Sequence, residues 1–205
     1  MRPESDTKTK LLETASDLIW QSSYGSVSVD DICTAAGVNK GSFYYAFKSK
    51  SDLAVAAFEH NWQTTIQPAM DQAFSAQLSP LNRIDKYCEL VVEGQKKKLA
   101  SFGKILGCPF SSLGCEISTQ DEKIRQKAEQ VSARMIKYIE SLARDLVADG
   151  LIENCDTNQL AQEVYFHVAG VMMQAKIENS LKPLDRLKHG VLRLLNLKNV
   201  QPATT

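Results

Sequence analysis

The residues best suited to bind another molecule lie between positions 28 and 53, in the run SVDDICTAAGVNKGSFYYAFKSKSDL. Three lysines and no acidic residue fall within residues 32–50, so positive charge collects where a phosphate backbone would lie. Lys40, Ser42 and Tyr44 add hydrogen-bond donors suited to base edges and phosphates. This run therefore predicts a contact with nucleic acid, although the formal net charge of the whole chain is zero.

Two short helices separated by a glycine turn are expected to position these groups. Ser28, with an acidic residue three positions later, is a capping-box-like start for a helix over about 29–36. Gly37 supplies the left-handed backbone that ends this helix. Asn39 is placed to cap a second helix over about 40–47. The pattern is that of a helix-turn-helix, whose second helix enters the major groove of DNA.

Two phenylalanines fix the orientation of the second helix. Phe43 and Phe47 are four residues apart and should both face the core, which turns the other side chains outward. The first turn then meets base edges, and the remaining polar groups meet phosphates. The residues expected at the DNA are Ser28, Lys40, Gly41, Ser42, Tyr44, Tyr45, Lys48 and Lys50.

Residues 8–54 resemble the N-terminal domain of TetR-type repressors. The usual run of that family, G-V-x-x-G-x-L/F-Y-x-H/Y-F-x-S/N-K-x-x-L, reads GVNKGSFYYAFKSKSDL here. Ala46 departs from the pattern, because the family usually carries histidine or tyrosine there, and Tyr45 is the candidate to supply the missing phosphate contact. The resemblance implies an all-helical homodimer that leaves a palindromic double-stranded DNA operator when a ligand or modification reshapes its C-terminal domain.

Apolar residues recur at helical spacing in the remainder of the chain as well, so we predict an all-α fold of about nine helices. A helix opened by Ser49 is expected to kink or end at Pro68. Further helices are expected at about residues 6–25, 81–100, 120–148, 157–179 and 183–197, with a loop and at most a short helix over 101–119 and a frayed tail, QPATT. The predicted domains are 1–53, which binds DNA, and 54–205, which senses an effector and dimerises.

The helix over 157–179 is apolar on more than one side, and such a helix must be covered on both. We expect it to pair, with the helix over 183–197, against a second copy of the chain. The alternative is an internal helix in a monomer.

Composition excludes several other classes of protein. No apolar stretch approaches the roughly 20 residues that a membrane-spanning helix needs, and the N-terminus lacks the apolar core of a secretion signal, so a cytoplasmic location is expected. Five cysteines with no CxxC pair argue against a disulfide framework and a structural zinc site. No metal or phosphate-loop motif is present, so no cofactor is expected.

Residues 107–118, GCPFSSLGCEIS, form the second informative segment. They resemble the G-C-L/P-x-x-x-L-x-x-E stretch of the TetR subgroup that includes the N-ethylmaleimide reductase repressor, and the run MMQAKIENSLKPLD places Lys176 where that subgroup has a lysine. This resemblance implies sensing of electrophiles or oxidants through Cys108. A helix N-terminus or a nearby ammonium such as Lys176 would favour a reactive thiolate there. Cys115 shares the face of Cys108 only if the intervening helix is regular.

Three alternatives to electrophile sensing remain open from the sequence. A sensor that controls efflux by binding an apolar molecule without covalent chemistry would use aromatic and methionine side chains, for which the candidates are Phe102, Phe110, Tyr138, Tyr165, Phe166 and Met173. A helical enzyme would use Cys108 as nucleophile and His167 as base, although nothing in their spacing supports that pairing, and we expect no enzyme activity. A helical adaptor that no longer binds DNA would fit Ala46 and the zero net charge.

Overall fold

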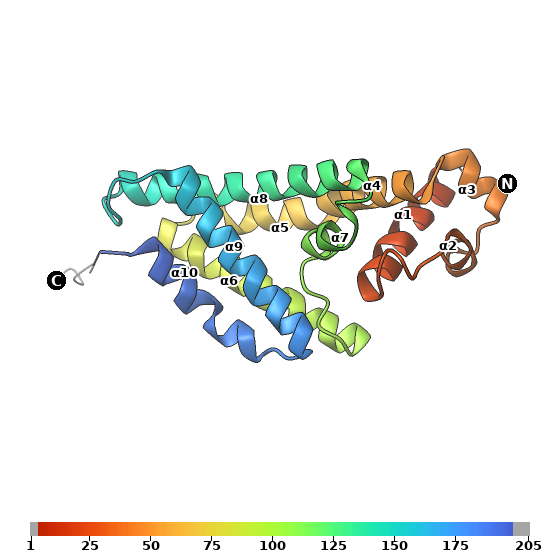
Figure 1. Ribbon diagram of the computed structural model, residues 1–205. Coiled ribbons are helices and arrows are strands. Elements are labelled where there is room, and N and C mark those ends of the chain that lie inside the picture. The colour runs from red at the N-terminus through yellow and green to blue at the C-terminus, as the bar shows by residue number, and fades with distance from the viewer. Residues whose placement is uncertain (1–3, 199–205) are drawn as a thin grey trace. The chain divides into compact units, whose positions relative to one another are not determined.

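The computed structural model describes residues 4–198, and these residues form helices and connecting loops without a strand (Figure 1). The helices are α1 (Glu4–Gln21), α2 (Val29–Ala36), α3 (Lys40–Ala46), α4 (Lys50–Asn61), η1 (Trp62–Ile66), α5 (Gln67–Ala73), α6 (Pro80–Phe102), α7 (Pro109–Ile117), α8 (Glu122–Ala148), α9 (Thr157–Glu178), η2 (Lys182–Arg186) and α10 (Leu187–Leu195). The segments α4, η1 and α5 are continuous, as are η2 and α10, so residues 4–198 contain nine helical rods. The all-α prediction is confirmed. The QPATT tail lies outside the described residues.

Packing divides the chain into two compact units. The first contains the described residues up to Pro68 together with Cys108–Val131, and the second contains Ala69–Gly107 and the residues from Ser132 onward. Helix α8 therefore contributes its N-terminal part to one unit and its C-terminal part to the other. This division follows packing, and the functional boundary expected after residue 53 stays a prediction.

The core of the first unit forms around α1, which packs against α2, α3, α4 and α7. Leu11, Ile32, Phe43 and Leu53 are completely buried there, and burial of each such side chain stabilises the fold by about 1.5–3 kcal/mol. This apolar packing holds the short helices α2 and α3, of eight and seven residues, which would not be stable alone.

The helix starts expected near Ser28, Asn39 and Ser49 are confirmed. Ser28 and Asp31 form a reciprocal capping box, and Gly37 ends α2 with a φ of 63°. The Asn39 side chain accepts the N–H of Ser42, and the Ser49 hydroxyl accepts the N–H of Asp52. Each such cap satisfies a backbone donor that has no partner within its helix, which is worth about 1 kcal/mol.

The sequence predicts a kink or an end at Pro68, and the helix does not end there. The helix instead widens to a π-helical turn over Trp62–Ile66, where the N–H of Gln67 bonds to the carbonyl of Trp62. Proline lacks a backbone donor and its ring crowds the carbonyl four residues earlier, and a widened turn relieves both problems. The helix then continues to Ala73.

The second unit is built from α5, α6, the C-terminal part of α8, α9 and α10. Its core contains Ile84, Ile139, Val164 and Leu187, all buried. Helix α10 packs against α6 and α9. The approach of α10 to α9 requires glycine at position 190, because a Cβ atom there would lie 2.1 Å from His167 Nε2.

No helix within residues 4–198 is both long enough and apolar enough to cross a bilayer.

Candidate nucleic-acid interface and sensing segment

Helix α3 turns one face to the core and the other to solvent, as the spacing of its phenylalanines predicts. Phe43 and Phe47 are buried, with exposed fractions of 0% and 6%, whereas Tyr44 and Tyr45 are 58% and 78% exposed. Lys40 and Gly41, in the first turn, are also exposed, and Ser42 is half-buried. Large aromatic side chains held in water by a rigid helix are suited to contact a partner.

An ion pair joins the first turn of α3 to α2. Lys40 Nζ lies 2.7 Å from Asp30 Oδ1, and both side chains are well exposed. The hydrogen bond from Lys40 to Asp30 raises the pKa of the lysine. Exposed pairs of this kind contribute little to stability, so the ammonium can exchange Asp30 for a base or phosphate at small cost.

The two lysines that flank the start of α4 differ in their surroundings. Lys48 is exposed. The Lys50 ammonium turns inward and donates to the carbonyls of Tyr24 and Val27, at 2.8 Å each, and lies 4.0 Å from the centre of the Tyr24 ring. Burial lowers the pKa of Lys50, and the Glu116 carboxylate opposes that shift. The sequence predicts that Lys50 contacts a DNA phosphate. In the structure its ammonium instead binds the turn between α1 and α2.

The N-terminal part of α8 is tied to α4 by two ion pairs within the first unit. Lys123 Nζ lies 2.7 Å from Asp52 Oδ1, and Lys127 Nζ lies 3.0 Å from Glu59 Oε2. The second pair is the more shielded, since the Lys127 side chain is mostly buried. Helix α4 is thus held to α8 as well as to α1.

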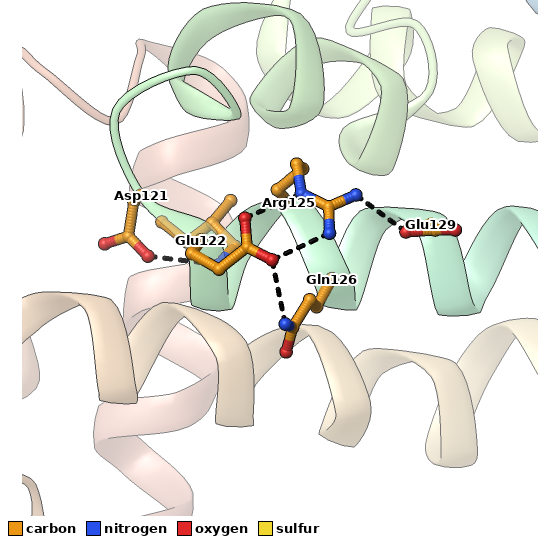
Figure 2. Close-up of polar contacts among 6 residues, drawn as sticks. Asp121, Glu122, Arg125, Gln126 and Glu129 are labelled. Carbon is orange, nitrogen blue, oxygen red and sulfur yellow. Dashed lines mark hydrogen bonds and ion pairs between the residues drawn. The ribbon is translucent and has the colours of Figure 1, made fainter.

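The first turn of α8 carries its own cap and a chain of side-chain bonds (Figure 2). The Asp121 carboxylate accepts the backbone N–H of Ile124 at 3.1 Å. Glu122 accepts bonds from Arg125 and Gln126, and Arg125 also donates to Glu129. The bonds from Arg125 and Gln126 lower the pKa of Glu122 to about 2. These four side chains bind one another along a single helix.

Cys108 is the N-cap residue of α7, and Pro109 occupies the first turn, as the sequence suggests. The Cys108 side chain is half-buried and makes no capping hydrogen bond. Cys108 therefore lies at the N-terminal end of a nine-residue helix. Helix α7 is regular as far as Ile117, and Cys115 is exposed on it.

Gly107, the residue before Cys108, is held by a buried side chain of α6. The Gln95 amide accepts the N–H of Gly107 at 3.0 Å and donates to its carbonyl at 3.2 Å. Gly107 has a φ of 67°, and a Cβ atom at this position would lie 3.2 Å from Lys176 Cδ. The Lys176 stem therefore packs directly beside Gly107. Sequence reasoning did not identify Gln95, since a lone glutamine in a helix carries no signal.

Glu116 is a second residue that sequence reasoning left without a role. Its carboxylate accepts the backbone N–H groups of Tyr24 and Gly25, at 2.9 and 2.7 Å. The side chain comes from α7, and the two amides belong to the turn between α1 and α2. The available signal for its role was that Glu116 ends the G-C-L/P-x-x-x-L-x-x-E stretch within residues 107–118.

The six side chains predicted to line an apolar pocket have separate surroundings. Phe110 is buried in the first unit with its ring 5.1 Å from that of Phe58. Tyr138 bonds to Asp71, and Tyr165 bonds to Ser132. Phe102 is half-buried beside Lys98, and Met173 is exposed.

Phe166, one of these six, lines a hollow formed by residues of α9 and η2. That hollow has a volume of about 600 Å³ and is open to solvent. Its lining residues are Phe166, His167, Gly170, Val171, Gln174, Glu178, Lys182, Pro183 and Arg186.

Within residues 4–198, no group of three or more histidine, cysteine or acidic side chains is gathered to hold a metal ion.

Two sequence profiles match the chain. The profile described as "Bacterial regulatory proteins, tetR family" matches residues 11–57, and that described as "Tetracyclin repressor-like, C-terminal domain" matches residues 80–191. The transcriptional regulator AcuR of Cereibacter sphaeroides is 31% identical over 176 residues, which cover 85% of this chain and 78% of AcuR. The HTH-type transcriptional repressor NemR of Escherichia coli K12 is 26% identical over 198 residues, which cover 96% of this chain and 94% of NemR.

Solved structures agree with these sequence matches. A regulatory protein TetR from Rhodobacter sphaeroides superposes with a TM-score of 0.81 at 29% identity, covering 91% of this chain and 97% of that protein. The reduced form of E. coli NemR superposes with a TM-score of 0.79 at 25% identity, covering 94% of this chain and 98% of that protein. Similarity therefore extends over both compact units.

Proposed function

This chain belongs to the TetR family of bacterial transcriptional regulators, and from that premise we propose that it is a dimeric repressor released from its operator by an electrophile. The observation that carries the DNA-binding part is the orientation of α3, which exposes Lys40, Gly41, Tyr44 and Tyr45 and buries its phenylalanines. Ser28, Ser42 and Lys48 complete the proposed contact surface. We place the protein in the cytoplasm, where bacterial DNA lies.

Operator binding is tested with DNA from the promoter region of the protein's own gene. Fluorescence anisotropy should show binding that weakens with salt, and Lys40→Ala or Tyr44→Phe should each weaken it roughly tenfold, as loss of one base or phosphate contact does. Lys86→Ala is the matched control, since Lys86 is an exposed lysine of α6 paired with Glu89. Equal affinities for the three variants and the wild-type protein would exclude α3 as the reading helix.

Dimerisation is proposed through α9 and α10. Phe166, Met173 and Ile177 are 60%, 55% and 69% exposed, and their spacing of seven and four residues places them on one face of α9. An apolar face of this kind is costly in water, and operator reading by a helix-turn-helix normally needs two copies about one DNA turn apart. A second copy of this chain meets both requirements.

Sedimentation equilibrium tests the proposed interface. Phe166→Glu and Ile177→Glu should convert the dimer to a monomer and abolish tight operator binding, because each places a charge in an apolar interface. Ala133→Glu, which adds the same charge at an exposed position of α8, should remain dimeric. A dimer that survives both α9 substitutions would place the interface elsewhere.

Release is proposed to begin at Cys108. Cys108 is a half-buried thiol at the start of α7, and the similarity of this chain to a repressor named NemR supports a sensing role for this segment. With N-ethylmaleimide, the thiolate adds to the C=C bond, a C–S bond forms, and the resulting carbanion takes a proton from water. The adduct favours the conformation that does not fit the operator.

Operator release by N-ethylmaleimide tests this step. The reagent should release the wild-type protein and Cys115→Ser, but leave Cys108→Ser on the operator. The matched pair is informative because Cys115 is the more exposed thiol of the same helix. Release of Cys108→Ser by an apolar compound, with no adduct formed, would favour the alternative of a non-covalent ligand.

A further inference from the structure

We propose that Glu116 is the positioning residue through which α7 controls the helix-turn-helix. This inference rests on the proposed function, since it assigns the connection between the sensing segment and the reading helices. It follows from the contacts of the Glu116 carboxylate, which ends the G-C-L/P-x-x-x-L-x-x-E stretch but is not among the predicted site residues.

The Glu116 carboxylate accepts hydrogen bonds from two successive backbone amides in the turn between α1 and α2. Oε2 accepts the N–H of Tyr24 at 2.9 Å, and Oε1 accepts the N–H of Gly25 at 2.7 Å. Bonds from neutral donors to an ionised acceptor are shorter and stronger than neutral ones, and two of them fix an orientation. The approach is close, since a Cβ atom at position 25 would lie 3.3 Å from Oε1.

The same turn is held on its carbonyl side by α4. Lys50 Nζ donates to the carbonyls of Tyr24 and Val27, at 2.8 Å each. A carboxylate from α7 and an ammonium from α4 thus bind opposite polar groups of one short segment. The turn therefore has a defined placement with respect to both helices, and a displacement of α7 must either move the turn or break the two Glu116 bonds.

A displacement at the start of α7 is expected to move its end as well. Cys108 occupies the N-cap position, and Glu116 lies in the last turn, eight residues later and about 12 Å along the axis. Between them, Phe110 packs edge-on against Phe58 of α4, and Leu113 is buried. A short, packed, regular helix moves as a rigid body, so a change at its first residue reaches its last.

The turn leads directly into the reading pair. Ser28, the N-cap of α2, follows Gly25 by three residues, and α2 packs against α3. Movement of the Tyr24–Gly25 segment therefore changes the placement of α2 and, with it, the face that α3 presents to DNA. The two bonds to Glu116 link α7 to this segment.

The test compares Glu116→Ala with Glu122→Ala. Glu122 is also an exposed glutamate of the first unit that accepts side-chain bonds, but its partners Arg125 and Gln126 lie on its own helix (Figure 2). Both variants should fold, since both side chains are exposed and water can replace their partners. Hydrogen exchange at the Tyr24 and Gly25 amides, and operator affinity with and without N-ethylmaleimide, are measured for each.

Glu116→Ala should speed exchange of the two amides about tenfold or more, since they lose their acceptors. It should weaken operator binding about threefold to tenfold and reduce the ratio of affinities without and with the reagent by a similar factor, within the range of coupling between sites. Glu116→Gln retains one acceptor oxygen and should give intermediate values for all three. Glu122→Ala should match the wild-type protein.

Equal operator affinity and equal release for Glu116→Ala and Glu122→Ala would overturn the inference and leave the proposed function intact. A wild-type protein that binds its operator but ignores the reagent would instead count against electrophile sensing. The role of Glu116 is then decided by the other two measurements: faster exchange with weaker binding supports it, and unchanged binding rejects it.

Discussion

Lys48 and Lys50 make different contacts in the first unit, so we expect substitutions of the two lysines to have different effects. Lys48→Ala should weaken operator binding at every sequence alike and reduce the slope of log affinity against log salt by about one, because one phosphate contact is lost. Its melting temperature should not change, since the side chain is exposed. Anisotropy at several salt concentrations and thermal melts measure the two properties.

Lys50→Met should have the opposite profile. The carbonyls of Tyr24 and Val27 lose their donor, so we expect the free energy of unfolding to fall by about 1–2 kcal/mol. The slope against salt should stay as in the wild-type protein if Lys50 makes no phosphate contact. A smaller slope with unchanged stability would return Lys50 to the DNA surface.

Individual thiols should also differ in reactivity. Burial raises the pKa of Cys88 to about 11 and raises that of Cys33, so both stay protonated at neutral pH. Because the thiolate is the nucleophile, N-ethylmaleimide at pH 7.5 should modify the exposed Cys115 and Cys155 well before either. Mass spectrometry of digests over time measures the order, and denaturation should make all five thiols react. Early modification of Cys88 would contradict its burial.

Among the helices, α6 has a task beyond packing, because Gln95 holds the segment that leads into α7. Gln95→Met preserves the length of the side chain but removes both bonds to Gly107, whose N–H and carbonyl stay buried without partners. We expect a loss of about 2–4 kcal/mol in the free energy of unfolding, measured by urea titration. The matched control is Gln126→Met, on the exposed face of α8, which should cost little. Equal losses would contradict a special role for Gln95.

Over the whole molecule, several carboxylates are stabilised in their charged form, which predicts acid sensitivity. Bonds from the Ser28 hydroxyl and backbone N–H lower the pKa of Asp31, and the bond from Lys123 lowers that of Asp52. Bonds from Arg125 and Gln126 lower the pKa of Glu122 to about 2. The native state therefore binds fewer protons than the unfolded state, in which such groups titrate near pH 4. Stability from these groups is present above about pH 5 and is lost as the pH falls toward 2.

Melting temperatures between pH 7 and 2 measure this loss. Asp52→Asn should lower the melting temperature at pH 7 and make its decline below pH 5 less steep, since one of the responsible carboxylates is absent. A decline of the same steepness would show that the pKa of Asp52 is ordinary in solution.

The sequence alone determined the local features of the reading element. Caps at Ser28, Asn39 and Ser49, the turn at Gly37 and the inward faces of Phe43 and Phe47 follow from nearest-neighbour backbone chemistry and helical period, which act over a few residues. The family resemblance followed from the same residues, and the all-α fold followed from helical period along the rest of the chain. Of the kink or end expected at Pro68, the end does not occur, because the helix widens to a π-helical turn over Trp62–Ile66 and continues to Ala73.

Only the tertiary structure decided which distant polar groups meet. Glu116 reaches Tyr24 and Gly25 across more than 90 positions, and Lys50 turns to the carbonyls of a turn formed over 20 residues earlier. Sequence gives the charge and spacing of such groups, but the partner of a carboxylate or an ammonium depends on how the helices pack. Periodicity reports which face of a helix is buried, whereas the contact made by each long polar side chain is fixed only when the neighbouring helices are in place.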